Sequence, residues 1–323
     1  MAAQHRLTSK PENLHWGAFS AEFPAAIEIE SGDQVVIETI SGGHNQVPEE
    51  KRDALLPDHA AFLADDRKPI LPGHILTGPV AVRGAEPGDV LEVRVIDVEL
   101  RQDWAWNMIA PLKGSLPEDF SENRVIPIDL DVDAGTATPP WGIELPLNPF
   151  FGVMGVAPPP EWGTITSIVP QPHGGNLDIK EFGAGATLYF PVYNAGGNFS
   201  TGDGHALQGD GESCLSAAET ALIGTFEFHV RKDMSLKMPR AETDTHYFTL
   251  GVDVDLDDAA KKALRDMIAL ITERTNLSRQ DAYSLISLAG DVRISQLVNV
   301  NKGCHLMLPK TALHGADIDG IRL

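Results

Sequence analysis

The sequence lacks three features that would narrow its function at once: clustered cysteines, a dense basic segment and a long apolar run. Cys214 and Cys304, the only cysteines in 323 residues, have neither the spacing of a redox pair nor the ligand number of a zinc finger, so we expect two reduced thiols. The formal net charge of −21, with scattered basic residues, argues against nucleic acid and anionic membranes as partners. No run of about 18 apolar residues occurs. The N-terminal segment also lacks the apolar stretch of a signal peptide, which predicts a cytoplasmic protein.

Common catalytic motifs are missing too. There is no HExxH helix motif, no cupin-type HxH spacing, no GxSxG nucleophile turn and no Ser-Ser-Lys amidase pattern. These absences lower the odds of serine catalysis. Any metal site must be assembled from residues with less regular spacing.

Alternating apolar and polar residues dominate the first two-thirds of the chain and predict a mainly β protein. Residues 25–40 alternate on both sides of a Ser-Gly-Asp turn, and residues 80–100 do so around Glu-Pro-Gly-Asp, so we expect two antiparallel hairpins. Residues 101–149 are rich in tryptophan and proline, which favours long loops with short edge strands. Residues 186–192 and 225–230 combine aromatic and β-branched residues, as strands do.

The last third of the chain has a different pattern. Apolar residues recur at helical spacing in residues 256–275. Ser278, three residues before an aspartate, resembles a capping box and predicts a second helix that ends at Gly290. Residues 292–300, followed by Asn-Lys-Gly and CHLML, predict a closing hairpin.

Polar residues concentrate in two glycine-rich segments, PHGGNLD at residues 172–178 and GDGHALQGDGE at residues 202–212. Imidazole and carboxylate groups separated by glycines suit a divalent cation, because glycine lets the backbone bend around the ion. A single Asp-Gly pair is more often a turn than a ligand. Two histidines, three aspartates and one glutamate within about forty residues favour a metal or catalytic site.

Further candidates lie outside these two segments. His44 sits in a Gly-Gly-His-Asn-Gln loop, where a functional group and a plain polar turn are about equally favoured. His74 begins a strand and could simply pack there. Trp141 and Phe151 are more often core residues, but a small apolar acyl pocket would need such side chains. Lys302 could face the same pocket, although a lone lysine in a turn is usually solvated.

Several long blocks of the sequence resemble the acetamidase/formamidase family. They are LTGPVAVRGAEPGDVLEVRV, NPFFGVMGVAPPPEWG, PHGGNLD, ATLYFPV, GDGHALQGDGE and the tail LSRQDAYSLISLAGDVRISQLVNVNKGCHLMLPK, in order over nearly the whole chain. The resemblance implies hydrolysis of formamide, acetamide or a related small amide to ammonia and the carboxylate, with cyclic amides as a further option. It also implies a zinc or calcium ion near the two glycine-rich segments, with zinc as the first choice.

The resemblance further implies a β-sandwich core. Together with the sequence patterns, it predicts a mainly β fold with an α+β C-terminal part, in which a jelly-roll-like sandwich carries two appended amphipathic helices. We expect the β core over residues 1–235 and the C-terminal subdomain, packed on the core, over residues 236–323. A homodimer or larger homo-oligomer is expected, since loop-rich β proteins often bury exposed tryptophans between subunits.

The working hypothesis gives each candidate residue a role. Four residues are expected to ligate the metal: His173, Asp178, Asp203 and His205. Catalysis is expected from Glu212, as the base toward a water activated by the ion, together with Asp210 and Gln208. Substrate contacts are expected from His44, Asn176, Trp141, Phe151 and Lys302.

Two alternatives stay open. Cys214 follows Glu212 closely and could be the acyl-transfer nucleophile, with Glu212 as its base and a purely structural metal. The chain could also be a non-catalytic β-sandwich that binds calcium and a small ligand.

Overall fold

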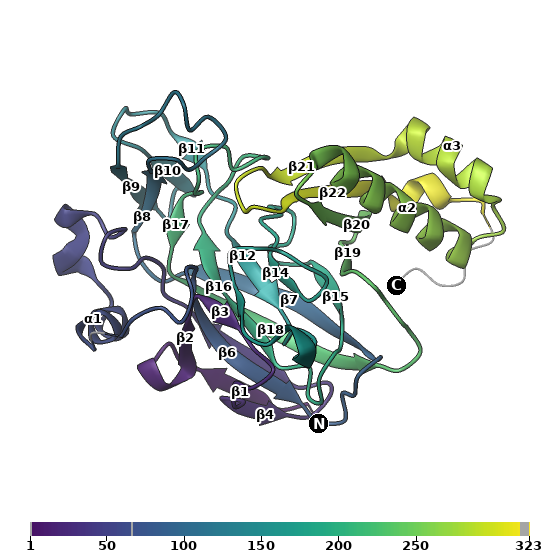
Figure 1. Ribbon diagram of the computed structural model, residues 1–323, viewed down its shortest axis with the longest axis horizontal. Helices are drawn as coiled ribbons and strands as arrows, with labels where there is room; N and C mark the ends of the chain where they lie inside the picture. Colours follow the sequence, from purple (N-terminus) through teal and green to yellow (C-terminus); the bar gives the residue numbers. More distant parts are fainter. Residues whose placement is uncertain (1, 66, 317–322) are drawn as a thin grey trace.

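The computed structural model describes residues 2–65, 67–316 and 323 of the chain. In this part the protein is mainly β with few helices, and its strands form several sheets, none of them closed (Figure 1). This confirms the mainly β class that the alternating residues predict, while the jelly-roll-like arrangement stays a prediction. Within the same residues, no helix is long and apolar enough to cross a membrane.

Two large sheets contain most of the strands. The first sheet has the order β1 (Gln4–Leu7), β5 (Gln34–Glu38), β18 (Leu222–Arg231), β7 (Val90–Leu100), β15 (Thr187–Pro191), β19 (Arg240–Glu242), β20 (His246–Asp253), β22 (Lys302–Pro309) and β21 (Asp291–Gln296). The second has the order β11 (Leu145–Pro146), β10 (Thr136–Thr138), β9 (Arg124–Asp131), β8 (Trp104–Ile109), β17 (Glu219–Thr220), β16 (Phe199–His205), β12 (Phe150–Gly155) and β14 (Gly174–Asn176).

Shorter elements complete the chain. Strand β6 (Ile75–Val82) joins β16 of the second sheet to β2 (Leu14–Trp16) and β4 (Ile27–Ile29), and a separate small sheet pairs β3 (Ala18–Phe19) with β13 (Ile165–Thr166). The helices are α1 (Pro57–Ala64), α2 (Leu256–Arg274) and α3 (Arg279–Ala289). Single 3-10 turns cover Pro11–Asn13, Glu49–Ala54, Pro160–Trp162 and Lys310–Leu313.

The main hydrophobic core lies between the two large sheets. Val35 and Phe226 of the first sheet and Val80 and Phe199 of the second are fully buried in one cluster. The rings of Phe199 and Phe226 meet across this core with their centroids 5.7 Å apart. Burying an apolar side chain of this size contributes about 1.5–3 kcal/mol. Packing in this core therefore holds the two sheets together and determines which faces of their strands are left for polar residues.

Both hairpins expected in the N-terminal third are wrong. Strand β4 pairs with β6 in the second sheet, whereas β5 pairs with β1 and β18 in the first. Likewise β6 lies in the second sheet and β7 pairs with β15 and β18 in the first. The turns exist, but at each one the chain crosses from one sheet to the other. Alternation shows which side of a strand is apolar, and it does not show which strand becomes its partner.

The C-terminal elements agree with the sequence patterns. Helix α2 has the predicted extent within one residue, and α3 begins after Ser278, whose Oγ accepts a hydrogen bond from the backbone N–H of Asp281 at 3.1 Å. Strands β21 and β22 pair as the predicted closing hairpin. The chain after residue 235 continues the first sheet, because β19 pairs with β15, and α2 and α3 lie at its far end (Figure 1). The division at residue 235 stays a prediction.

Candidate active site

A row of four paired residues crosses the second sheet. Phe150 of β12 lies opposite His205 of β16, His205 lies opposite Glu219 of β17, and Glu219 lies opposite Trp106 of β8. Residues directly opposite each other in antiparallel strands project from the same face of a sheet. The ring of Phe150 packs edge-on against His205, with centroids 4.9 Å apart. In this row the imidazole of His205 and the carboxylate of Glu219 lie side by side, between the aromatic side chains of Phe150 and Trp106.

The GDGH segment forms the end of β16. Because side chains alternate along a strand, Asp203 and His205 share one face, and Gly202 and Gly204 face the other. That other face has no room for a side chain at Gly204, because a Cβ there would lie 2.6 Å from the Cγ of Leu222 and from the carbonyl oxygen of Thr220. The alternation of glycine with polar residues therefore places both polar side chains on the face of the site.

Gly152 of β12 leaves room for the polar side chains to converge. A Cβ at this position would lie 2.5 Å from Asp178 Oδ1, 2.6 Å from Asp203 Oδ2 and 2.7 Å from His205 Cε1. All three contacts are closer than a carbon atom can approach. The three side chains thus occupy the space that any larger residue would fill.

Loops bring the other acidic residues to this point. Asp178 follows β14, and Glu212 lies in the loop between β16 and β17. The backbone φ angles of Asp178, Asp203 and Glu212 are +50°, +56° and +45°. The left-handed region is costly for residues other than glycine, by about 1–3 kcal/mol each. Three such residues in one cluster show that the fold is strained in order to bring these carboxylates together.

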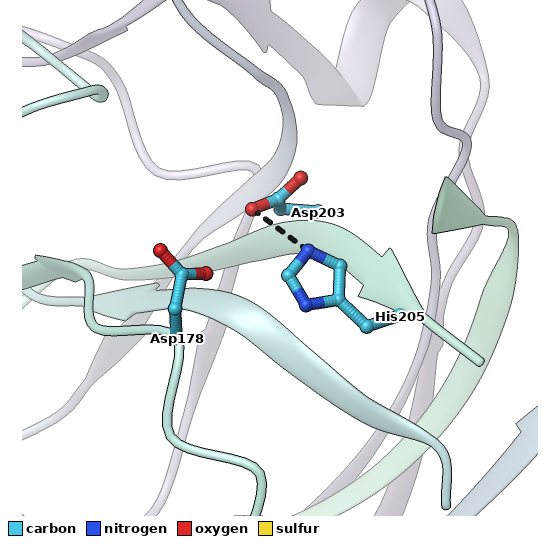
Figure 2. Close-up of side chains that lie close together, drawn as sticks. All are labelled: Asp178, Asp203 and His205. Carbon is cyan, nitrogen blue, oxygen red and sulfur yellow. Dashed lines mark ion pairs between the residues drawn. The ribbon is translucent and has the colours of Figure 1, made fainter. Parts of the chain in front are cut away.

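Five buried side chains form the polar cluster, which consists of Asp178, Asp203, His205, Glu212 and Glu219. The imidazole Nε2 of His205 lies 3.3 Å from Glu219 Oε1, 3.4 Å from Asp203 Oδ2 and 4.0 Å from Glu212 Oε1. In Figure 2 the carboxylates of Asp178 and Asp203 both lie beside the ring of His205, on the same side of it. Two overlapping groups have ligand atoms close enough for one ion: Asp178, Asp203 and His205, and His205, Glu212 and Glu219.

Burial shifts the protonation of the acids in the cluster. Burial, reinforced by the neighbouring Asp203 charge, raises the pKa of Asp178 to about 7 and that of Glu219 to about 8. Burial and the Asp178 charge raise the pKa of Glu212 well above its usual value. Desolvation disfavours the charged form of an acid, and a like charge nearby adds to this effect. Without a cation, Glu212 and Glu219 therefore hold protons at neutral pH, and Asp178 is only partly ionised.

Asp203 and His205 are shifted toward their charged forms. Burial works against both charges, but the carboxylates of Glu219 and Asp203 outweigh it and raise the pKa of His205 well above 6.5. For Asp203, attraction to His74 and His205 outweighs burial and lowers the pKa. His74 Nε2 lies 3.8 Å from Asp203 Oδ2. The cluster still has more carboxylates than cationic partners.

Two asparagines connect the acids to the rest of the fold. Asn299 lies in the loop between β21 and β22, and its Nδ2 donates to Asp178 Oδ2 at 2.5 Å. With the amide nitrogen of Asn176 facing the acids, its Nδ2 donates to the Oδ2 atoms of Asp178 and Asp203 at 3.2 Å, and its Oδ1 accepts from Asn299. The C-terminal hairpin therefore contributes directly to the site.

The polar cluster opens into a cavity of about 250 Å³. Its polar lining residues include His74, Asn176, Asp203, Glu212, Glu219 and Asn299. A concave site with a few convergent polar groups of shifted pKa is the usual form of an active site.

The structure separates the residues of the first glycine-rich segment. Asp178 belongs to the polar cluster and Asn176 donates to it, but His173 does not join either group of ion-binding atoms. Its ring packs edge-on against Phe19 with centroids 4.9 Å apart, and neither ring nitrogen has a hydrogen-bond partner among the described residues. Burial lowers the pKa of His173 to about 3, so its ring is neutral.

In the second segment, Gln208 and Asp210 lie beside the cluster. Gln208 Nε2 donates to the carbonyl oxygens of Asp178 at 2.8 Å and Ser295 at 3.3 Å, which ties the loop of Asp178 to β21. Asp210 forms an ion pair with Lys180 at 3.0 Å. Neither residue is among the described residues that line the cavity.

Four residues expected at the substrate lie elsewhere. None of them is among the described lining residues of the main cavity. Trp141 is 55% exposed, Phe151 is buried in the main core, Lys302 Nζ donates to the Val254 carbonyl oxygen at 2.6 Å, and His44 lines a separate hollow. In the His44 loop the preceding Gly42 and Gly43 line the cavity instead. Phe150, one position before Phe151, is the ring that packs on His205, because neighbouring residues in a strand face opposite sides.

Cys214 lies outside the main cavity. Its Sγ is 3.3 Å from the amide nitrogen of Asn107, and it lines a second, smaller hollow with Ile109, Leu116 and Phe120.

The sequence interpretation missed Glu219 and Asn299. Glu219 is a single acid among small and apolar residues in SAAETAL, and a charge in such a run is a signal that could have been used. Asn299 occurs in VNVN at the end of the strand predicted over residues 292–300, next to the predicted Asn-Lys-Gly turn, where asparagine is common, so it gave no signal.

A buried carboxylate–histidine cluster at the base of a cavity has the form of an enzyme active site. The sequence model of the Acetamidase/Formamidase family matches residues 3–164 and 162–314, so the chain belongs to that family, and it is a hydrolase that acts on linear amides.

Solved structures agree with the family assignment. A protein described as a predicted acetamidase/formamidase from Thermoanaerobacter tengcongensis is 31% identical, with a TM-score of 0.86 over 100% of both chains. An acetamidase from Bacillus halodurans is 32% identical, with a TM-score of 0.82 over 96% of this chain and 97% of the other. In a comparison of sequences alone, a formamidase from Methylophilus methylotrophus is 24% identical, over 76% of this chain and 78% of its own length.

Proposed function

We propose that the protein is a metal-dependent amidohydrolase that releases ammonia from small carboxylic amides. The observation that carries this proposal is the convergence of Asp178, Asp203 and His205 on the space left by Gly152, at the base of an open cavity. The family assignment supports the amide substrate, and the cluster supports the metal.

The cluster fits a divalent cation. Its carboxylates are buried, and within the described residues His205 Nδ1 and Glu219 Oε2 lack a hydrogen-bond partner. Buried charges require an opposite charge or a metal. Asp178, Asp203 and His205 would hold the ion. Mixed imidazole and carboxylate ligands favour zinc, with calcium as the alternative. The ion would polarise the amide carbonyl and promote ionisation of a water molecule.

The remaining acids have separate roles. Glu212 lines the cavity, and its raised pKa suits a group that takes a proton from water and gives it to the departing amide nitrogen, which leaves as ammonia. Glu219 orients His205 from the opposite strand at 3.3 Å. Gln208 holds the Asp178 loop, and the Asn176 and Asn299 amides orient the Asp178 carboxylate.

The position of Cys214 supports a water nucleophile over a thiol. Cys214 lines a different hollow, and its Sγ contacts Asn107 and the Ser216 carbonyl oxygen. We also propose a cytoplasmic homo-oligomer. The exposed side chains of Val132, Trp141 and Ile143, which lie close together along the chain, support an apolar subunit contact.

Ammonia release from formamide, acetamide and propionamide tests the proposed function. Chelation should abolish release, and added zinc should restore it. Glu212→Gln should retain the metal and lower kcat about 100-fold or more, since general acid–base catalysis is lost. Exposed Glu144→Gln is the matched control, and Cys214→Ala should stay active. Full activity after complete removal of the metal would refute the metal role, and full activity of Glu212→Gln would remove that residue from catalysis.

A further inference from the structure

The cavity is larger than a two-carbon amide needs. Its volume is about 250 Å³, which corresponds to roughly eight water molecules at about 30 Å³ each. Acetamide has four non-hydrogen atoms and takes the place of roughly two or three waters. Even with an ion and a water at the carboxylates, much of the space is left for the acyl part of a substrate.

Apolar side chains supply much of the lining, namely Trp16, Ile40, Trp106, Met108, Ile168 and Val298. Trp106 lies opposite Glu219 in the pairing of β8 with β17, so its indole lies next to the carboxylate of Glu219. Trp16 is fixed by a hydrogen bond from Nε1 to the Gly73 carbonyl oxygen at 3.2 Å and packs on Phe62 of α1. These indoles form a preorganised apolar surface next to the reacting centre.

Two glycines let the backbone of one loop approach both indoles. A Cβ on Gly42 would lie 3.0 Å from Trp106 Nε1, and a Cβ on Gly43 would lie 3.0 Å from Trp16 Cζ2. Any side chain at these positions would press on the indoles and reduce the space. The loop therefore keeps an apolar compartment open beside the carboxylate cluster.

We propose that the preferred substrates are primary amides whose acyl group is apolar and bulkier than acetyl, either branched or aromatic. This inference rests on the proposed amidohydrolase function. Such an acyl group removes apolar surface of the substrate and of Trp16, Trp106 and Ile168 from water at the same time. A charged acyl group would face these apolar walls and, on the other side, the buried acids.

The first experiment compares kcat/KM of the metal-loaded enzyme for formamide, acetamide, isobutyramide, isovaleramide, phenylacetamide and succinamate. Burial of each methylene should raise kcat/KM about fourfold, so isovaleramide should exceed acetamide by roughly tenfold or more. Highest kcat/KM for formamide or acetamide would overturn the inference and leave the amidohydrolase function intact. Highest kcat/KM for succinamate would also overturn it, and would point to Lys113 in the lining as a partner for the carboxylate.

Variants of the residues that line the cavity test where the acyl group of the substrate binds. Ile168 is a partly exposed lining residue, so Ile168→Phe adds volume inside the cavity. It should lower kcat/KM for isovaleramide about tenfold and change that for acetamide less than twofold. The control is Ile96→Phe at an exposed position of β7, which should change neither value. Equal losses for both amides would place the acyl group elsewhere. Met108→Ala, which enlarges the cavity, should raise the ratio of phenylacetamide to acetamide turnover.

Calorimetric titration separates this inference from the proposed function. If no amide releases ammonia but isovaleramide binds more tightly than acetamide, the apolar compartment is correct and the hydrolytic function is wrong. If ammonia is released but binding does not increase with acyl size, the compartment does not hold the acyl group.

Discussion

Gly152 has a chemical consequence although it has no side chain. Its absent Cβ is the space in which Asp178, Asp203 and His205 meet, and two of these residues, Asp178 and Asp203, have strained backbone conformations. Strain of this kind persists only where the surrounding structure enforces it, and it is common at active sites. At the scale of single residues, the site depends on one glycine and on aspartates whose backbone φ angles lie in the left-handed region, which residues other than glycine rarely adopt.

Gly152→Ala should therefore disrupt the site without unfolding the protein. The new methyl group must displace at least one of the three side chains, so we expect metal affinity to fall at least tenfold and turnover about 100-fold, in line with displaced metal ligands. Metal content after dialysis and kcat are the measurements. Gly209→Ala is the matched control, because its Cβ would meet nothing within 4 Å. Unchanged metal content in Gly152→Ala would contradict the assigned ligand set.

The hairpin of β21 and β22 carries one end of the first sheet into the site. Asn299 in its loop binds Asp178, while Asn301 in the same loop donates to the Pro170 carbonyl oxygen at 3.1 Å. Asn299→Ala should remove one of the two amide donors to the buried Asp178 carboxylate, and a lost hydrogen bond to a charged group costs about 1.5–3 kcal/mol. We expect kcat/KM to fall about tenfold or more. Asn301→Ala should change kcat/KM less than twofold, and equal effects of both variants would show a general loosening of the loop.

Local signals in the sequence predicted individual elements better than their partners. The cap at Ser278 and the last hairpin depend on residues close together in the chain, and both are confirmed, although the loop of the hairpin covers residues 297–301 and not the predicted 301–303. The two expected N-terminal hairpins are wrong because strand pairing depends on residues far away, such as β18 for β5. For the same reason the glycine-rich segments led to Asp178, Asp203 and His205, while Glu219 joins them only through pairing of β17 with β16.

At the scale of the whole molecule, folding concentrates negative charge in a chain that already carries a net charge of −21. Asp178, Glu212 and Glu219 have raised pKa values in the folded protein, with Asp178 at about 7 and Glu219 at about 8. Through these three acids the metal-free folded state keeps protons that the unfolded state loses between about pH 4.5 and pH 8. The lowered pKa values of the buried histidines His15, His173 and His305 oppose this effect below about pH 6.5, so the excess of bound protons is clearest above that pH. Stability falls with rising pH wherever the folded state holds more protons. His205, with its raised pKa, acts in the same direction, whereas Asp203, with its lowered pKa, is ionised in both states over this pH range and adds no pH dependence.

The metal-free protein should thus lose thermal stability between pH 5.5 and pH 8.5 more steeply than the metal-loaded protein. A bound cation replaces the protons as the partner of the carboxylates, and a hundredfold excess over Kd stabilises by about 2.7 kcal/mol. We expect a Tm difference of roughly 5 °C at pH 8 that shrinks toward pH 5.5. Comparing both forms at each pH cancels the repulsion of surface charges, which they share. A Tm difference that does not change with pH would mean that the cation does not bind at the titrating carboxylates.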